Sequence, residues 1–222
     1  MKQPQTRSSL ISLFVLLAAY PAFAGHGFMS AFGNIEWLPE PGRTPDSAWY
    51  TLDTWYEEGQ LWLAATPQEK FQLALAFAGE KLAEAESMLT TQNTAAAQIA
   101  TNQYWYYIDR AEQAIATLPG EQEEIGQGSV ELVERLATAL LEHQYILTII
   151  YTDLTNLTNL TDLTELTPES RSVLREVFTT AQKRYAAIAD RLPRKTRGAL
   201  FFKEEEVRWY IAMAIRTDEQ SR

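Results

Sequence analysis

The sequence predicts an all-α protein, folded as an antiparallel bundle of about six helices. Apolar residues recur at alternating spacings of three and four over long stretches after residue 45, as on amphipathic helices. Helix start and stop signals stand at Thr66-Pro67 and at Pro119-Gly120. No segment requires a strand. With 222 residues, of which 46% are hydrophobic and 22% charged, the chain suits one globular domain.

The first 24 residues have the three-part layout of a secretory signal peptide. Lys2 and Arg7 precede an apolar run over 10–19, and Pro21 and the triplet Ala22-Phe23-Ala24 follow it. We expect cleavage after Ala24, an exported protein that is periplasmic or secreted, and no membrane span in the mature chain.

Two sections are predicted after the signal peptide, and the second contains a low-complexity segment. Residues 25–43 hold four Gly and two Pro with no helical period, which indicates an extended arm. Residues 44–222 form the helical domain. Within that domain, residues 152–167 carry Leu at every third position. Because a step of three residues turns a helix by 300°, these leucines rotate around the axis. This section is either a helical extension or a loosely ordered connector.

The first two helices are expected over 45–65 and from residue 67 to about 90. Thr66 can cap the second helix, Pro67 suits its first position, and Glu69 can reach back to the cap amide. The apolar stripe of the second helix comprises Phe71, Leu75, Ala78, Leu82, Ala85 and Leu89.

Four further helices are expected along the rest of the domain. The third covers 94–118, and Ser129 is the predicted cap of the fourth, which carries His143 on its apolar face as an expected core histidine. Thr167 is the predicted cap of the fifth, which Pro193 ends. The last covers about 198–215.

Three motifs in residues 44–90 resemble a bacterial extracytoplasmic family known only as a domain of unknown function. They are TPDSAWYTL (44–52), TPQEK (66–70) and FAGEKLAEAE (77–86). The family patterns are similar to P-x-S-P-x-Y-x-L-K, D-P-x-x-K and L-A-E-x-R-L-x-E-A-E. Ala48 stands where the family prefers Pro, Asp53 where it prefers Lys, and Thr66 where it prefers Asp. The resemblance implies an exported helical-hairpin module, and it supplies no catalytic residue.

Composition argues against most covalent chemistry. The chain has no Cys, which excludes thiol nucleophiles and thiolate zinc sites, and only two His. Neither His follows a Glu by three residues, as di-iron bundles require, and there is no G-x-S-x-G motif. The net charge of −10 disfavours nucleic acid as a partner. We expect no enzyme activity, no cofactor and no metal.

Aromatic residues offer a candidate contact site. Trp49 and Trp55 belong to the first helical stretch, and four consecutive aromatic residues occupy the middle of the third, namely Tyr104, Trp105, Tyr106 and Tyr107. Four consecutive side chains point in all directions from a helix, so some must contact another element or a partner. Either the arm and first helix cover them, or they line a groove for a peptide, an unfolded chain or a glycan.

The sequence thus favours an exported bacterial helical protein that acts by binding or as a structural component of the envelope. Its partner would be a protein, peptide or glycan there. A periplasmic chaperone or stress-sensor partner is the alternative, and a cell-wall glycan-acting enzyme comes next.

Overall fold

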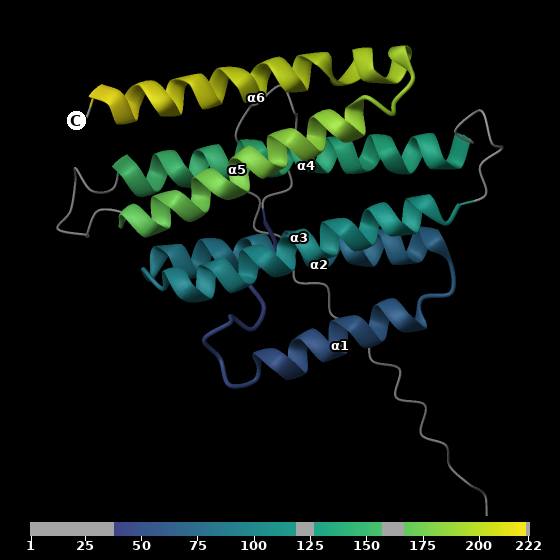
Figure 1. The fold of residues 1–222 in the computed structure, drawn as a ribbon, viewed down its shortest axis with the longest axis horizontal. Helices are drawn as coiled ribbons and strands as arrows, with labels where there is room; N and C mark the ends of the chain where they lie inside the picture. The colour runs from purple at the N-terminus through teal and green to yellow at the C-terminus, as the bar shows by residue number, and fades with distance from the viewer. Residues whose placement is uncertain (1–37, 119–126, 157–166, 221–222) are drawn as a thin grey trace, which may run out of the picture.

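A computed structural model describes residues 38–118, 127–156 and 167–220 of the chain (Figure 1). These residues form six α-helices and no strand, which confirms the all-α prediction. The helices are α1 (Tyr50–Leu63), α2 (Pro67–Thr90), α3 (Thr94–Ala116), α4 (Gln127–Asn156), α5 (Pro168–Ala189) and α6 (Arg194–Gln220). No helix in the described ranges is long and apolar enough to cross a membrane.

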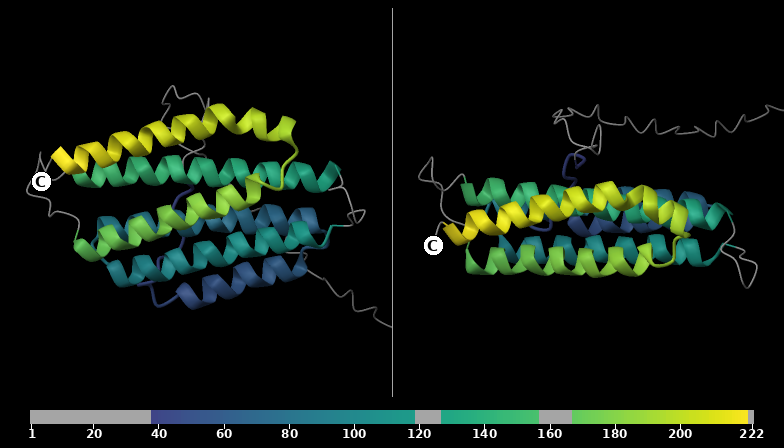
Figure 2. Two further views of the ribbon diagram at one scale, coloured as in Figure 1. Left: turned by 45° about the horizontal axis from the view of Figure 1, so that its top comes forward. Right: turned by 90° about the horizontal axis from the view of Figure 1, so that it is seen from above.

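The helices lie roughly along one axis in two layers. Helices α1, α2, α4 and α6 pack side by side in that order and form one layer, and α3 and α5 form the other (Figure 2). Helices α2 to α5 therefore form the centre. Helix α1 packs on α2 at one edge of the molecule, and α6 packs on α4 at the opposite edge (Figure 1).

Two predicted helix starts are confirmed by their cap geometry. The Thr66 hydroxyl accepts a hydrogen bond from Glu69 N at 3.1 Å, and the Glu69 carboxylate accepts one from Thr66 N at 3.0 Å. This reciprocal pair is a capping box. At α5, the Thr167 hydroxyl accepts a hydrogen bond from Ser170 N at 3.1 Å.

Three predicted starts are wrong by a few residues. Helix α1 begins at Tyr50 rather than at 45, because a turn closed by Ser47 N and Thr44 O occupies the preceding residues. Helix α4 begins at Gln127, so Ser129 lies inside the helix and does not cap it. Helix α6 begins at Arg194 rather than near 198, because the Pro193 carbonyl already accepts a hydrogen bond from Arg197 N at 2.9 Å.

The turn between α2 and α3 is a Schellman motif. Asn93 N donates to Met88 O at 2.8 Å and Gln92 N donates to Leu89 O at 3.0 Å, so the last carbonyls of α2 are satisfied. Gln92 has a φ of 60°, in the left-handed region that favours glycine. The short turn makes α2 and α3 antiparallel neighbours.

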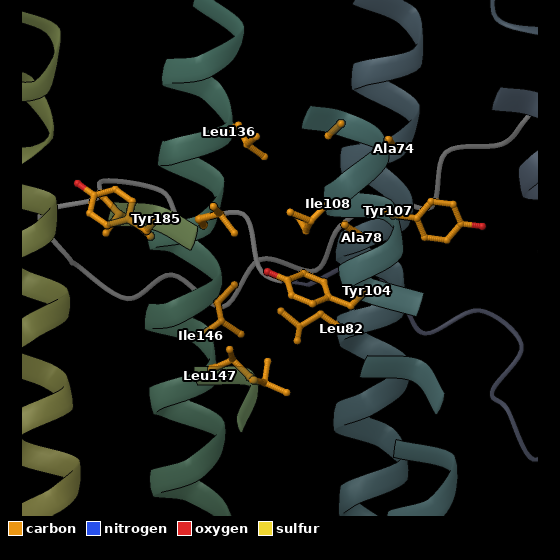
Figure 3. Close-up of a cluster of buried hydrophobic side chains, with 14 of the residues drawn as sticks. Ala74, Ala78, Leu82, Tyr104, Tyr107, Ile108, Leu136, Ile146, Leu147 and Tyr185 are labelled. Atoms are coloured by element: carbon orange, nitrogen blue, oxygen red, sulfur yellow. The ribbon is translucent and has the colours of Figure 1, made fainter. Parts of the chain in front are cut away.

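The core lies where α2 and α3 face α4 and α5. The apolar stripe predicted for α2 is buried apart from Leu75, which is partly buried against the same core. Tyr104 of α3 points toward Ile146 and Leu147 of α4, whereas Tyr107 points the opposite way (Figure 3). A single apolar cluster thus joins the central helices.

Several predictions fall wholly or partly outside the described residues. The signal peptide over 1–24 lies outside them, as does the arm up to residue 37. In the described end of the arm, Leu38 is buried and no helix forms. Helix α4 continues to Asn156, so the predicted connector over 152–167 begins as helix, and residues 157–166 lie outside the described part.

Candidate functional site

Helix α1 has its polar and apolar faces reversed. The residues that turn toward the bundle, Tyr50, Thr54, Glu57 and Leu61, are spaced by four, three and four, and Glu57 and Leu61 are buried. An edge helix ordinarily places its apolar stripe against the core and its charges outside. In α1 the inner face is largely polar and the large apolar residues point outward.

A buried ion pair network holds this inner face. Lys81 of α2 is fully buried, and its Nζ lies 2.7 Å from Glu57 Oε1 and 2.7 Å from Glu84 Oε1. The Tyr107 hydroxyl of α3 donates to Glu57 Oε2 at 2.6 Å. The same Nζ lies 5.1 Å from the centre of the Tyr50 ring, within range of a cation–π contact. One ammonium group therefore connects α1 to α2, and Glu57 extends the connection to α3.

Burial controls the pKa values of this network. Burial disfavours the charged carboxylates, and it raises the pKa of Glu57 and brings that of Glu84 to about 7 in spite of their bonds to Lys81. For Lys81, burial disfavours the ammonium, but hydrogen bonds to Glu57 and Glu84 outweigh this cost and the pKa is raised. The lysine thus stays charged, while Glu84 is close to neutralisation near pH 7.

The network also includes polar atoms that are not fully satisfied. Glu84 Oε2 and the Tyr50 hydroxyl are buried without a hydrogen-bond partner among the described residues. A buried ion pair recovers its desolvation cost only when geometry and hydrogen bonding are good, and loss of one member leaves an unpaired buried charge. We infer that the network fixes where α1 sits more than it adds to net stability.

Three carboxylates beside the network have the chemistry of a cation site. Ligand oxygens of Asp53, Glu57 and Glu80 all lie within 4.8 Å of one another. Carboxylate oxygens suit hard cations such as Ca²⁺ or Mg²⁺. Glu57, however, is already bound to Lys81, which supplies a positive charge at this point.

The outer face of α1 is an uncharged apolar surface. The exposed residues of the helix are Thr51, Leu52, Trp55, Tyr56, Trp62 and Leu63. The exposed fractions are 72% for Trp55, 80% for Trp62 and 73% for Leu63. Thr51 and Leu52 precede Trp55 and Tyr56 by four residues, and these precede Trp62 and Leu63 by seven, so the six side chains form one face. A row of exposed aromatic and aliphatic side chains on one helix is typical of a protein contact surface. We call these six residues the α1 outer face.

The six predicted contact residues are separated by the structure. Trp55 lies on the α1 outer face, and Trp49 is exposed just before the helix. Tyr104 and Tyr107 are completely buried, because α3 is covered from both sides, so in this structure neither side chain is open to a partner. Trp105 is partly buried against the core, and its ring lies 5.0 Å from the Arg184 guanidinium carbon.

Tyr106 is the remaining member of the predicted aromatic run. It is 39% exposed, and its ring lies 5.9 Å from the guanidinium carbon of Arg110. Arg110 in turn pairs with Glu58 of α1 at 3.8 Å. The run of four aromatics therefore serves mainly to pack α3 among its neighbours.

His143 is a core residue, as the sequence predicts. It is buried, and its Nδ1 lies 3.1 Å from the Tyr104 hydroxyl. Burial disfavours the imidazolium and lowers the pKa of His143 to about 4, so the ring is neutral near pH 7. Because the neutral ring is hydrogen-bonded to Tyr104 in the core, His143 fits a structural role.

Sequence reasoning missed the buried network and most of the α1 outer face. A signal was present on α2, where Phe77, Lys81, Glu84 and Met88 repeat the spacing of four, three and four. Because this stripe comes in addition to the predicted apolar stripe of α2, it indicates that α2 is covered on two sides. Helix α1 also has two stripes, and the more apolar of them is the one that faces outward.

Comparison with protein families gives one match. The family described as a domain of unknown function (DUF5667) matches residues 42–156, which is more than half of the chain and includes α1 to α4. No curated protein and no solved structure matches. The match agrees with the resemblance of residues 44–90, which already includes the α1 outer face, and extends it through α3 and α4, so that Tyr107 of the buried network is included as well. The chain therefore belongs to the DUF5667 family.

Proposed function

We propose that the protein acts by binding, without covalent chemistry, and that the α1 outer face holds an apolar helical segment of another protein chain. The observation that carries the proposal is the reversal of α1, which exposes Trp55 and Trp62 to solvent while a lysine is buried beneath the helix. Exposure of large apolar residues has no benefit for an isolated chain, since burial of each would favour folding.

The chemistry of the face favours a protein partner over a glycan. Sugar recognition combines aromatic rings with several polar groups that bind hydroxyls, and the exposed residues of α1 offer only the Thr51 and Tyr56 hydroxyls and the indole N–H groups of Trp55 and Trp62. An amphipathic helix, in contrast, can place its apolar residues against a row of this kind and add a further helix to the edge of the layer. Tryptophan and tyrosine are also the side chains that dominate binding energy at protein interfaces.

Export is part of the same proposal. It is supported by the basic, apolar and small-residue sections of residues 1–24, which would direct the chain out of the cytoplasm. Sequencing of the protein from an extracytoplasmic fraction should give Gly25 as the first residue. Recovery of intact protein beginning at Met1 from the cytoplasm alone would contradict this part.

The binding proposal is tested with a labelled synthetic peptide that forms an amphipathic helix with a leucine face. Fluorescence anisotropy should show saturable binding to the protein. The variant W55S/W62S should bind at least tenfold more weakly, because the two largest side chains are lost from the face and tryptophan is the side chain most enriched in binding hot spots. The matched control F201S/F202S removes two exposed aromatics from α6 and should bind as the wild type does. Both variants change exposed side chains, so circular dichroism should be unaltered.

Three outcomes would contradict or redirect the proposal. Equal binding by wild type and W55S/W62S would show that the α1 outer face is not the site. A concentration-dependent dimer that W55S/W62S abolishes, without peptide binding, would assign the face to a second copy of the chain. If the protein instead suppresses aggregation of an unfolded client at less than equimolar amounts, and W55S/W62S does not, the chaperone alternative replaces the proposal.

A further inference from the structure

The start of α6 is a basic region in an otherwise acidic protein. Residues 191–203 contain Arg191, Arg194, Lys195, Arg197 and Lys203 and no acidic residue, while the whole chain has a net charge of −10. Two of these charges are compensated within the fold. Arg197 lies 2.6 Å from Asp190, and Lys203 lies 3.9 Å from Glu142. The side chains of Arg191, Arg194 and Lys195 are exposed.

These charges stand where helix electrostatics opposes them. The N-terminal end of a helix carries a partial positive charge, which favours acidic residues and disfavours Lys and Arg. Helix α6 has no acidic residue in its first turn and begins with Arg194 and Lys195. A basic first turn that costs stability indicates a role outside the fold.

Exposed aromatic residues continue the same face of α6. Phe201 and Phe202 are 53% and 76% exposed and follow Arg194 and Lys195 by seven residues, so they lie about two turns, or roughly 10 Å, further along the same face. Trp209, seven residues after Phe202, is exposed as well. The face therefore presents basic side chains first and aromatic rings next. We call these five residues the α6 basic-aromatic face. Glu205 lies on the same face between Phe202 and Trp209, and its charge is paired with Arg208 at 2.7 Å.

We propose that the α6 basic-aromatic face docks on the surface of an anionic lipid bilayer. Charge complementarity selects this partner, since lipid phosphates attract Arg194 and Lys195 while the acidic remainder of the protein is repelled. The phenyl and indole rings suit the boundary between headgroups and acyl chains, where aromatic side chains of surface-bound helices insert. Helix α6 forms one edge of the molecule and packs mainly on α4, so no other described helix covers its outer side (Figure 2).

The proposal is tested by cosedimentation of the full chain with lipid vesicles. Vesicles with 30% phosphatidylglycerol in phosphatidylcholine should bind the protein at least tenfold better than pure phosphatidylcholine at low salt, and the difference should shrink as salt is raised. The variant R194E/K195E should lose this preference. The variant F201S/F202S should bind more weakly to the mixed vesicles but should keep the dependence on salt.

The matched control is R175E/K183E, which makes the same change of charge at exposed positions of α5. It should change vesicle binding less than threefold. Equal loss in R175E/K183E and R194E/K195E would overturn the proposal, because the effect would then follow net charge alone. The proposal would also be overturned if the wild type does not bind the mixed vesicles. Binding of duplex DNA by the basic face, without binding of vesicles, would count as such a failure.

Discussion

Lys81 is the residue on which the position of α1 depends. Its ammonium group is fully buried and bridges Glu57 of α1 and Glu84 of its own helix. Glu57 receives a second hydrogen bond from Tyr107, so one carboxylate connects three helices. Below this network α1 contributes only one fully apolar buried residue, Leu61. The attachment of α1 is therefore largely electrostatic.

Replacement of Lys81 by Met should destabilise the protein by about 3–5 kcal/mol at pH 8, because Glu57 and Glu84 would be left unpaired in the interior. The loss should be smaller at pH 5. Without the ammonium, both carboxylates bind protons more readily in the folded state, so the stability of the variant falls more steeply as pH rises. Urea unfolding at the two pH values measures this. The control Lys183→Met, at an exposed position of α5, should cost less than about 0.5 kcal/mol. A loss in Lys81→Met that does not depend on pH would contradict the expectation.

His143 should make the stability depend on pH in the opposite direction. Its pKa is lowered to about 4 in the folded protein, against 6.5 for an unperturbed histidine. The stability that comes from the neutral ring is complete above pH 6.5 and is lost as pH falls through 4. Wild type loses this contribution on acidification and His143→Gln does not. The free energy of unfolding that His143→Gln lacks relative to wild type should therefore shrink by about 3 kcal/mol between pH 7 and pH 4.

Chemical denaturation of both proteins across this pH range measures the deficit. Tyr104→Phe keeps the histidine buried and serves as a control, because it should retain the pH dependence of the wild type. A constant difference between His143→Gln and wild type would show that His143 is already exposed to protons in the folded state.

At the scale of the element, helical periodicity predicts the existence and approximate extent of each helix well. It does not show which face of the helix turns toward the core. The capping residues Thr66 and Thr167 are local signals, and both predictions are confirmed. On α1 the apolar stripe is real, yet it faces outward, because the polar stripe meets Lys81. That lysine belongs to another helix, and a single-helix pattern contains no information about it.

For the candidate site, the sequence likewise identifies candidate residues but not which of them are exposed. Trp55 is a contact candidate by its aromatic character and is exposed, but Tyr104 and Tyr107 share that character and are buried. Composition cannot separate an aromatic residue that packs between helices from one that is exposed on an edge helix. The distinction depends on which neighbour covers the helix, and this is set by the order of the helices in the layers.

The turn between α2 and α3 offers a test at the same scale. Gln92 adopts a φ of 60° in the Schellman motif, a conformation that costs energy for a residue with a Cβ. Gln92→Gly should stabilise the protein by about 0.5–1 kcal/mol. The same substitution at Gln72, an exposed position inside α2, should destabilise it by about 1 kcal/mol. Thermal unfolding of the two variants should shift in opposite directions. A lower melting temperature for both would mean that Gln92 is not strained.

At the scale of the whole molecule, the two proposed contact surfaces lie at opposite edges. The centre, α2 to α5, is a packed core that fixes the helices, and it contains Tyr104, Trp105 and Tyr107 of the six predicted contact residues. One edge carries the uncharged α1 outer face, and the other carries the α6 basic-aromatic face (Figure 1). A protein built in this way can hold a partner chain at one edge while the other edge rests on an anionic surface.

Hydroxyl-radical footprinting of the full chain tests the role of the α1 outer face most directly, because oxidation reports the exposure of individual side chains. In the free protein Trp55, Trp62 and Trp209 should all be oxidised rapidly, since all are exposed. With saturating amphipathic peptide, we predict that oxidation of Trp55 and Trp62 falls at least fivefold while that of Trp209 does not change. Saturated binding that leaves the oxidation of Trp55 and Trp62 unaltered would contradict the assignment of α1 as the contact surface.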